Sequence, residues 1–240
     1  MSTSTATHPG KTRIASALLS LAGAVLLRIL FRQEYSLPAS AQTTGPVLIL
    51  AKHRQELDIL LGYRGMLKAF RRHAWCIMKA SLARKRYLGF FYRIGGIPLD
   101  RDKPEKSRNY LKFARKVLFE RNPGGLNPGS GNMMVLFPEQ TVYPENMGEG
   151  KVAGFRFLAG KPPESSPLTV YCAGIEYLKG FPRGRAILRF SEPRSFSAKD
   201  RPEVFLHDCM VEIARLSNLS YSFPAPGSPA VMIDSSGGKN

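Results

Sequence analysis

Cysteine is scarce in this chain, and its three residues lie far apart. Cys76, Cys172 and Cys209 form no C-x-x-C pair. Their odd number and wide spacing indicate neither a disulfide framework nor a zinc site. We therefore expect a reducing, cytoplasmic setting and no bound metal.

Signatures of nucleotide and cofactor binding are also missing. The sequence contains no internal repeat, no P-loop and no G-x-G-x-x-G fingerprint. A glycine-containing stretch at 124–131 lacks the Lys-Ser or Lys-Thr pair that makes such a loop bind phosphate. We expect a protein that works without a cofactor.

Acidic residues are few, with 18 Asp and Glu against 35 Lys and Arg, so the net charge is +17. Such a balance indicates a polyanionic partner, which the charge alone does not identify: nucleic acid, anionic lipid headgroups or an acidic carrier protein. The 43% hydrophobic content indicates one folded domain within the 240 residues. The ends, residues 1–13 and 223–240, are rich in small and polar residues, and we predict disorder there.

No apolar run reaches the roughly 20 residues that a membrane-crossing helix needs. The longest uncharged run covers residues 14–27. We predict a membrane-associated helix over 14–34, with flanking cations that reach anionic headgroups while the apolar side chains enter the acyl region. These cations are Lys11, Arg13, Arg28 and Arg32.

Two other interpretations of this segment stay open. Lys11 and Arg13 precede the apolar run, and residues 39–41 (Ala-Ser-Ala) resemble a cleavage site, as in a secretory signal peptide. Arg28, Arg32 and Glu34 interrupt the approach to that site. A buried core helix is the third interpretation, because uniform apolarity is compatible with it.

Apolar strand-like and amphipathic helical segments alternate along the rest of the chain. This alternation predicts an α/β fold, with a single domain over 35–222 whose mostly parallel mixed sheet is flanked by helices. A functional site is then expected at the carboxyl ends of the strands. The expected strands are 47–51, 74–78, 97–99, 133–137, 168–175 and 186–190, and the expected helices are 56–70, 84–94, 103–122 and 202–216.

Polar clusters follow these strands, and their pattern resembles a known family. Segment 52–58 (KHRQELD) resembles the H-x-x-x-x-D motif of the glycerolipid acyltransferases, the family of 1-acylglycerol-3-phosphate acyltransferases. Segment 95–101 (GGIPLDR) resembles the family's second motif, and 137–141 (FPEQT) its third, F-P-E-G-T. A proline-led strand at 167–170 stands where the family has its fourth. The resemblance spans roughly 47–175, with order and spacing maintained.

His53 and Asp58 are the predicted catalytic pair. A lipid hydroxyl needs a base near neutral pH to attack a thioester, and an imidazole, with an ordinary pKa of about 6.5, is suited. Positions five apart on a helix point in different directions, so the two side chains meet only if the chain turns between them. Asp58 then holds one ring nitrogen protonated and stabilises the imidazolium. The alternative is that Asp58 merely caps a helix.

The resemblance also implies substrate-binding residues. Arg101 matches the family's phosphate-binding arginine, and Glu139 is expected to orient the acceptor headgroup; its alternative is a structural ion pair. Lys79 matches a lysine that could stabilise the tetrahedral oxyanion. Further substrate contacts are expected from Gln140, Thr141 and Lys151.

The sequence therefore predicts an acyltransferase at the cytoplasmic face of a membrane. Its expected partners are acyl-CoA or acyl-carrier protein as donor, a lysolipid acceptor and an anionic membrane surface, and nucleic acid is disfavoured. One alternative is an enzyme of the same fold with a different acceptor. Another is a basic peripheral protein, binding membrane or nucleic acid, whose site has decayed.

Overall fold

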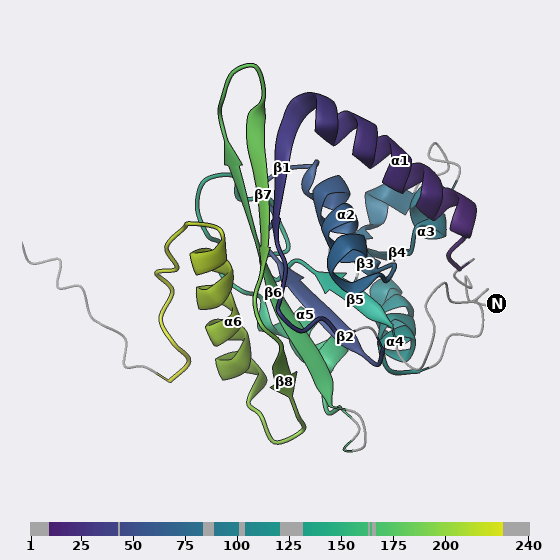
Figure 1. The fold of residues 1–240 in the computed structure, drawn as a ribbon. Coiled ribbons are helices and arrows are strands. Elements are labelled where there is room, and N and C mark those ends of the chain that lie inside the picture. The colour runs from purple at the N-terminus through teal and green to yellow at the C-terminus, as the bar shows by residue number, and fades with distance from the viewer. Residues whose placement is uncertain are drawn as a thin grey trace, which may run out of the picture.

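The chain folds around one mixed sheet of eight strands, as the computed structural model shows (Figure 1). The structure describes residues 10–42, 44–83, 89–100, 104–120, 132–162, 164 and 167–227. Seven strands follow the order β1-β7-β6-β2-β5-β3-β4, and β8 pairs with β6. The strands are β1 (Phe31–Ser36), β2 (Val47–Ala51), β3 (Trp75–Lys79), β4 (Gly96–Leu99), β5 (Met133–Leu136), β6 (Leu168–Leu178), β7 (Gly184–Phe190) and β8 (Arg194–Phe196).

Five neighbouring strands, from β6 through β2, β5 and β3 to β4, run parallel. Strands β7 and β8 run antiparallel to β6, and β1 is parallel to β7. Every residue of β2 is buried, which its unbroken apolar sequence predicts for a central strand covered on both faces. The carboxyl ends of the five parallel strands meet at one edge of the sheet.

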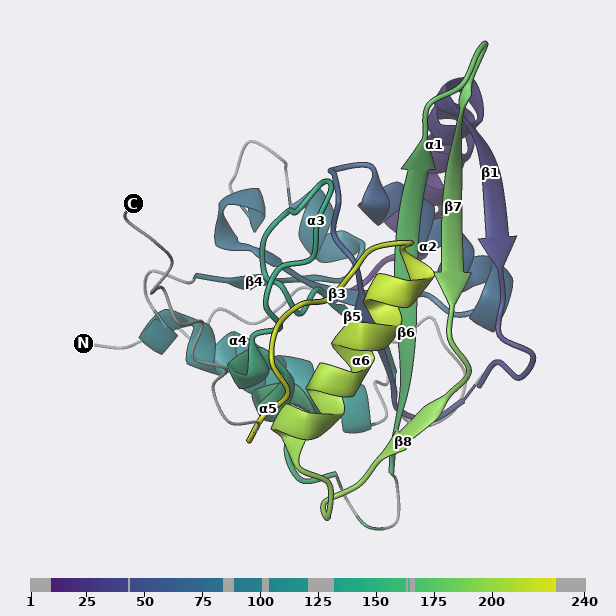
Figure 2. The ribbon, with the colours of Figure 1, turned by 90° about the vertical axis from the view of Figure 1, so that its left-hand side faces the viewer.

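Helices cover both faces of the sheet (Figure 1, Figure 2). On one face α4 (Pro104–Phe119), α5 (Val152–Ala159) and α6 (Pro202–Leu216) pack against Leu48 and Leu50 of β2. On the other face α2 (Asp58–Phe70) packs against Val47 and Ile49. The alternation of side chains along β2 thus builds two cores.

The expected N-terminal helix is α1 (Arg13–Leu30), and it lies against the domain. Thr12 caps it by accepting a hydrogen bond from the Ala15 amide, and Leu19 and Leu27 are buried. The chain then passes directly into edge strand β1, so the last residues of the expected 14–34 helix are extended. No helix of the described ranges is long and apolar enough to span a bilayer.

Lys11 corrects the expected set of headgroup-facing cations. Its ammonium group is buried and donates hydrogen bonds of 2.9 and 2.7 Å to the carbonyl oxygens of His73 and Ala74. The pKa of Lys11 is lowered to about 7, mainly by burial and to a smaller extent by the nearby charge of Arg72. Lys11 therefore ties the start of α1 to the domain rather than to a surface.

The structure confirms the six expected strands to within three residues and the helices over 56–70, 103–122 and 202–216 to within three residues at each end. Of the helix predicted over 84–94, the structure describes residues 89–94, and α3 covers Phe90–Arg93 of these. Gly89, with φ of 70°, is the N-cap residue at which this short helix begins. Strands β1 and β8 and helix α5 were not predicted.

Candidate active site

A tight turn after β2 brings His53 to Asp58. The ring Nδ1 of His53 lies 3.0 Å from Oδ2 of Asp58, which is the first residue of α2. The turn between them is closed by a backbone hydrogen bond from the Asp58 amide to the Gln55 carbonyl. The predicted meeting of the two side chains is therefore present, and a strand-to-helix junction produces it.

The carboxylate of Asp58 is fully buried and held by three further donors. Its Oδ2 accepts hydrogen bonds from the backbone amides of Arg54, at 2.5 Å, and Gln55, at 2.8 Å. Its Oδ1 accepts a 2.8 Å hydrogen bond from the hydroxyl of Tyr177. A buried carboxylate is stable only when its oxygens are satisfied, and four donors satisfy this one.

The orientation of the His53 ring follows from these contacts. Because the Asp58 carboxylate is an acceptor, the contact favours the tautomer with the proton on Nδ1, which leaves Nε2 without a proton. The ring stacks on Phe137 with centroids 4.5 Å apart, and its side chain is 17% exposed. The His53 carbonyl oxygen accepts a hydrogen bond from the Tyr143 amide, which ties the turn to the loop after β5. The ring of His53 is thus held in place, with Nδ1 directed at Asp58.

Glu139 forms a buried ion pair rather than a contact in the open site. Its carboxylate oxygens lie 2.9 and 2.8 Å from Nζ of Lys52, and it also accepts a hydrogen bond from the Gly148 amide. Burial lowers the pKa of Lys52, and the contact with Glu139 acts in the opposite direction. The structural pairing that the sequence left open for Glu139 is the arrangement found, and it fastens the loop after β5 to the loop after β2.

Gln140 occupies a backbone position that normally suits glycine. Its φ is 59°, in the left-handed region, and its amide donates to the Phe137 carbonyl across the turn. A residue with a Cβ is strained there, which explains the glycine at the matching position of the F-P-E-G-T motif. The Gln140 side chain reaches over Gly154, since a Cβ on that glycine would lie 3.4 Å from its Nε2.

A pocket of about 480 Å³ opens beside His53. Its polar walls include Lys79 at the end of β3 and Gln140 and Thr141 after β5. Val142 also lines it. Leu99, the last residue of β4, lines it as well, so the carboxyl ends of the four parallel strands β2, β5, β3 and β4 contribute to one pocket, as the predicted sheet required.

Lys151, another expected substrate contact, lies outside this pocket. Lys151 is an exposed residue whose Nζ pairs with Glu149, and this partner raises the pKa of Lys151. It does not line the pocket of His53. Arg101 falls outside the described residues.

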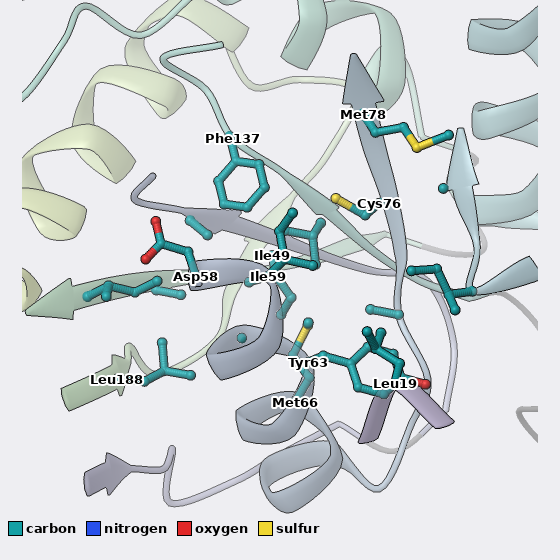
Figure 3. A pocket seen from close by; sticks show the side chains of 18 of the residues that line it. Leu19, Ile49, Asp58, Ile59, Tyr63, Met66, Cys76, Met78, Phe137 and Leu188 are labelled. Atoms are coloured by element: carbon teal, nitrogen blue, oxygen red, sulfur yellow. The ribbon is translucent and has the colours of Figure 1, made fainter. Parts of the chain in front are cut away.

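An apolar cavity lies behind the pocket, between α2 and the sheet (Figure 3). It measures about 80 Å³ and extends from Asp58 and Phe137 to Leu19 of α1. It shares part of its wall with the pocket of His53, namely Ile59, Cys76, Met78, Leu82 and Phe137. A small cavity with such walls stays dry and accepts apolar atoms.

Several residues that shape the site were missed by the sequence interpretation. Lys52 and Tyr177 are separated from their partners by 87 and 119 residues, so no local pattern connects them. Arg54 anchors the loop after β5 through a hydrogen bond to the Pro144 carbonyl. The described residues bring together no cluster of three His, Cys, Asp or Glu side chains of the kind that holds a metal ion.

Comparisons with known proteins show the family and a similar fold. A family model described as "Acyltransferase" matches residues 29–161. The 1-acyl-sn-glycerophosphate (LPA) acyltransferase PlsC from Thermotoga maritima is similar in structure, with a TM-score of 0.54 and 14% sequence identity over 85% of this chain and 78% of that one. At this identity the similarity is one of fold. A search of curated proteins found no match.

Proposed function

The chain belongs to the acyltransferase family, and from that premise we propose that it transfers a fatty acyl group from a thioester to the hydroxyl of a lysophospholipid-like acceptor. The observation that carries the proposal is the His53–Asp58 pair, whose free Nε2 belongs to a ring that lines a pocket. The fold shared with an LPA acyltransferase supports an acceptor of this class. Acyl-CoA or acyl-carrier protein is the proposed donor, and a net charge of +17 suits either anion.

In the proposed mechanism Nε2 of His53 takes the proton of the acceptor hydroxyl as its oxygen attacks the thioester carbonyl. Asp58 stabilises the imidazolium that forms. Lys79, on the pocket wall, is placed to stabilise the negative charge that develops on the carbonyl oxygen. The tetrahedral intermediate then expels the thiolate, which receives the proton from His53, and the new ester bond remains.

The apolar cavity behind the pocket is the proposed location for part of the acyl chain. Its walls are almost entirely hydrocarbon and sulfur, and they adjoin the pocket at Phe137 and Ile59. Burial of each methylene contributes roughly 0.8 kcal/mol, so a chain placed there would be bound by apolar contact alone. Membrane association at the cytoplasmic face would supply lipid acceptors directly.

The test is a reaction of purified protein in detergent with acyl thioesters and a panel of lysolipids, in which free thiol and new lipid are both followed. We expect equal amounts of the two products, formed only when both substrates are present. Thiol release without a new lipid would identify a thioesterase and contradict the proposal.

Tyr177 is expected to be a positioning residue for Asp58. Burial, followed by the charge of Asp58, raises the pKa of Tyr177, so its phenol stays protonated and donates. The variant Tyr177→Phe should lower kcat about ten-fold with KM little changed, because Asp58 and the His53 ring lose a contact that positions them, and a hydrogen bond to a charged group is worth about 1.5–3 kcal/mol, of which only part acts on the transition state. The freed carboxylate is a stronger counter-charge, so the acid limb of kcat/KM should move to higher pH.

The matched control for this variant is Tyr171→Phe in the same strand. The hydroxyl of Tyr171 bonds to the backbone of Ser40 and Gln42, at the end of β6 away from Asp58. The Tyr171→Phe variant is expected to lose stability without a change in the pH profile of kcat/KM. If Tyr177→Phe behaves like this control, the hydrogen bond to Asp58 has only a structural role.

Val142 is expected to weaken the selectivity for a terminal phosphate. The family commonly has an arginine after F-P-E-G-T, and Val142 on the pocket wall offers neither charge nor donor. We expect a preference for acceptors with a phosphodiester or no phosphate. Val142→Arg should raise the specificity constant for lysophosphatidic acid relative to these by about ten- to a hundred-fold, since a charge-assisted contact contributes roughly 1.5–3 kcal/mol.

Val142→Gln, which is long and polar but uncharged, is the control for this substitution. It should leave the relative specificity constants near those of the original chain. A strong preference of the original chain for lysophosphatidic acid, or an arginine variant that gains nothing on it, would contradict the prediction.

A further inference from the structure

The outward face of α1 carries an uncovered apolar stripe. It consists of Ile14, Leu18, Leu21, Val25 and Ile29, which follow one another at helical spacing and are each at least 54% exposed. The opposite face of the helix is buried on α2 and the domain. A soluble protein rarely leaves such a row of aliphatic side chains in water.

A basic groove runs beside this stripe. Four segments contribute the residues that line it: the end of α1, strand β1, helix α2 and the β6–β7 hairpin, which Figure 1 locates in the fold. Its volume is about 440 Å³. Five cations line it, Arg28, Arg32, Arg64, Lys68 and Arg183, with Ala24, Phe31 and Gln33.

Three of these cations, Arg183, Arg64 and Lys68, make contacts that hold them in place without neutralising their charge. Arg183 donates a 2.6 Å hydrogen bond to the Arg28 carbonyl, which joins the hairpin to α1. Arg64 donates to the Gln33 side chain at 3.2 Å, and Lys68 lies 4.4 Å from the centroid of the Tyr35 ring. All of these partners are uncharged. Among the residues that the structure describes, no carboxylate lines the groove.

Acidic side chains near the groove are directed elsewhere. Glu34, the residue after Gln33, forms two hydrogen bonds of 2.7 Å with Arg185 on β7. Five positive charges gathered in one concave site repel one another, and an anion that enters the groove relieves this repulsion. Guanidinium groups suit phosphate in particular, because they offer paired donors in a plane.

We propose that the basic groove binds the phosphate of an anionic phospholipid headgroup, whose acyl chains lie beside the exposed stripe of α1. The position of the groove favours a lipid over a free phosphate, because Arg28 borders the stripe on the same helix. Phe181, at the tip of the hairpin that carries Arg183, is 100% exposed and supplies another apolar side chain at this surface. The inference rests on the proposed membrane association and gives it an orientation.

This orientation places lipid close to the candidate active site. Phe31 lines the groove, and its ring centroid lies 5.3 Å from that of Tyr177, the donor to Asp58. One aromatic pair therefore separates the groove from the buried carboxylate. A headgroup held there would keep the pocket of His53 near the membrane surface.

The experiment measures binding of the full chain to vesicles of phosphatidylcholine alone and of phosphatidylcholine mixed equally with phosphatidylglycerol. Arg28→Gln combined with Lys68→Gln should weaken partition to the anionic vesicles about thirty-fold, because each cation removed is expected to weaken it roughly five-fold. The control combines Arg108→Gln with Lys112→Gln on α4, which removes the same two residue types from exposed positions on the other face of the sheet. It should change partition less than about three-fold, since surface attraction decays within a Debye length.

Equal losses in the two double variants would show that only net charge matters and would overturn the headgroup site. A third arm replaces chloride by inorganic phosphate at the same ionic strength. Displacement of the original chain by phosphate would assign the groove to a soluble anion and overturn the lipid assignment. Vesicle binding requires no turnover, so its result is independent of acyl transfer. If the original chain bound no vesicles, membrane association itself would fail, whereas binding that ignores the groove variants would refute the site alone.

Discussion

Replacing His53 by alanine is expected to lower kcat by about 10²–10⁴-fold, the usual effect of removing a positioned general base. The ring supplies the only nitrogen base paired with a buried carboxylate in the pocket that the structure describes. The side chain is partly exposed and its removal leaves the carboxylate of Asp58 with three other donors, so the fold should persist. Turnover is measured with a saturating thioester and a lysolipid, beside a thermal unfolding curve.

His207→Ala provides the control, because His207 lies on α6 and its ring packs against Tyr221, away from the pocket. It should retain near-normal turnover. A His53→Ala enzyme that kept near-normal turnover would eliminate the proposed base. A variant that failed to fold would be replaced by His53→Gln, which retains a polar side chain but no base of comparable strength.

Asp58→Asn is expected to cause a loss of similar size, about 10²–10⁴-fold in kcat. The surroundings of the carboxylate dictate how an amide would fit. Its single oxygen must face the amides of Arg54 and Gln55, and its NH₂ group then faces the hydroxyl of Tyr177. The proton on Nδ1 of His53 keeps its acceptor in this arrangement. What is lost is the negative charge that stabilises the imidazolium.

The substitution is expected to change the pH dependence of kcat/KM in a distinct way. Without the counter-charge the imidazolium gives up its proton more readily, so the acid limb of kcat/KM should move to lower pH, opposite to the shift expected for Tyr177→Phe. The double variant His53→Ala/Asp58→Asn should be no slower than His53→Ala alone, because Asp58 acts through the ring. A change in unfolding temperature alone, with kcat and the pH profile unaltered, would reduce Asp58 to a structural residue at the start of α2.

The contact between His53 and Asp58 could be predicted from sequence because both residues belong to one short segment. The five-residue spacing of His53 and Asp58 lies within one turn of chain, and the apolar run of β2 before it indicates a buried strand that ends there. The position of Gln140 was visible as a departure from the motif, although its left-handed backbone was not. Strand β1 escaped prediction because its sequence is polar, as suits an edge strand that is paired on one side.

The sequence by itself determined the six predicted strands and the contact between His53 and Asp58, since each depends on residues within a few positions of one another, and it determined the family because short motifs keep their order along the chain. Only the tertiary structure decided which strand ends are neighbours, and with them the Lys52–Glu139 pair, the Tyr177–Asp58 hydrogen bond and the basic groove. The apolar segment of α1 fitted three interpretations, because apolarity alone does not say which face is covered. The packing of α1 on α2 shows which face is covered. It leaves one apolar face exposed beside five cations that come from distant parts of the chain.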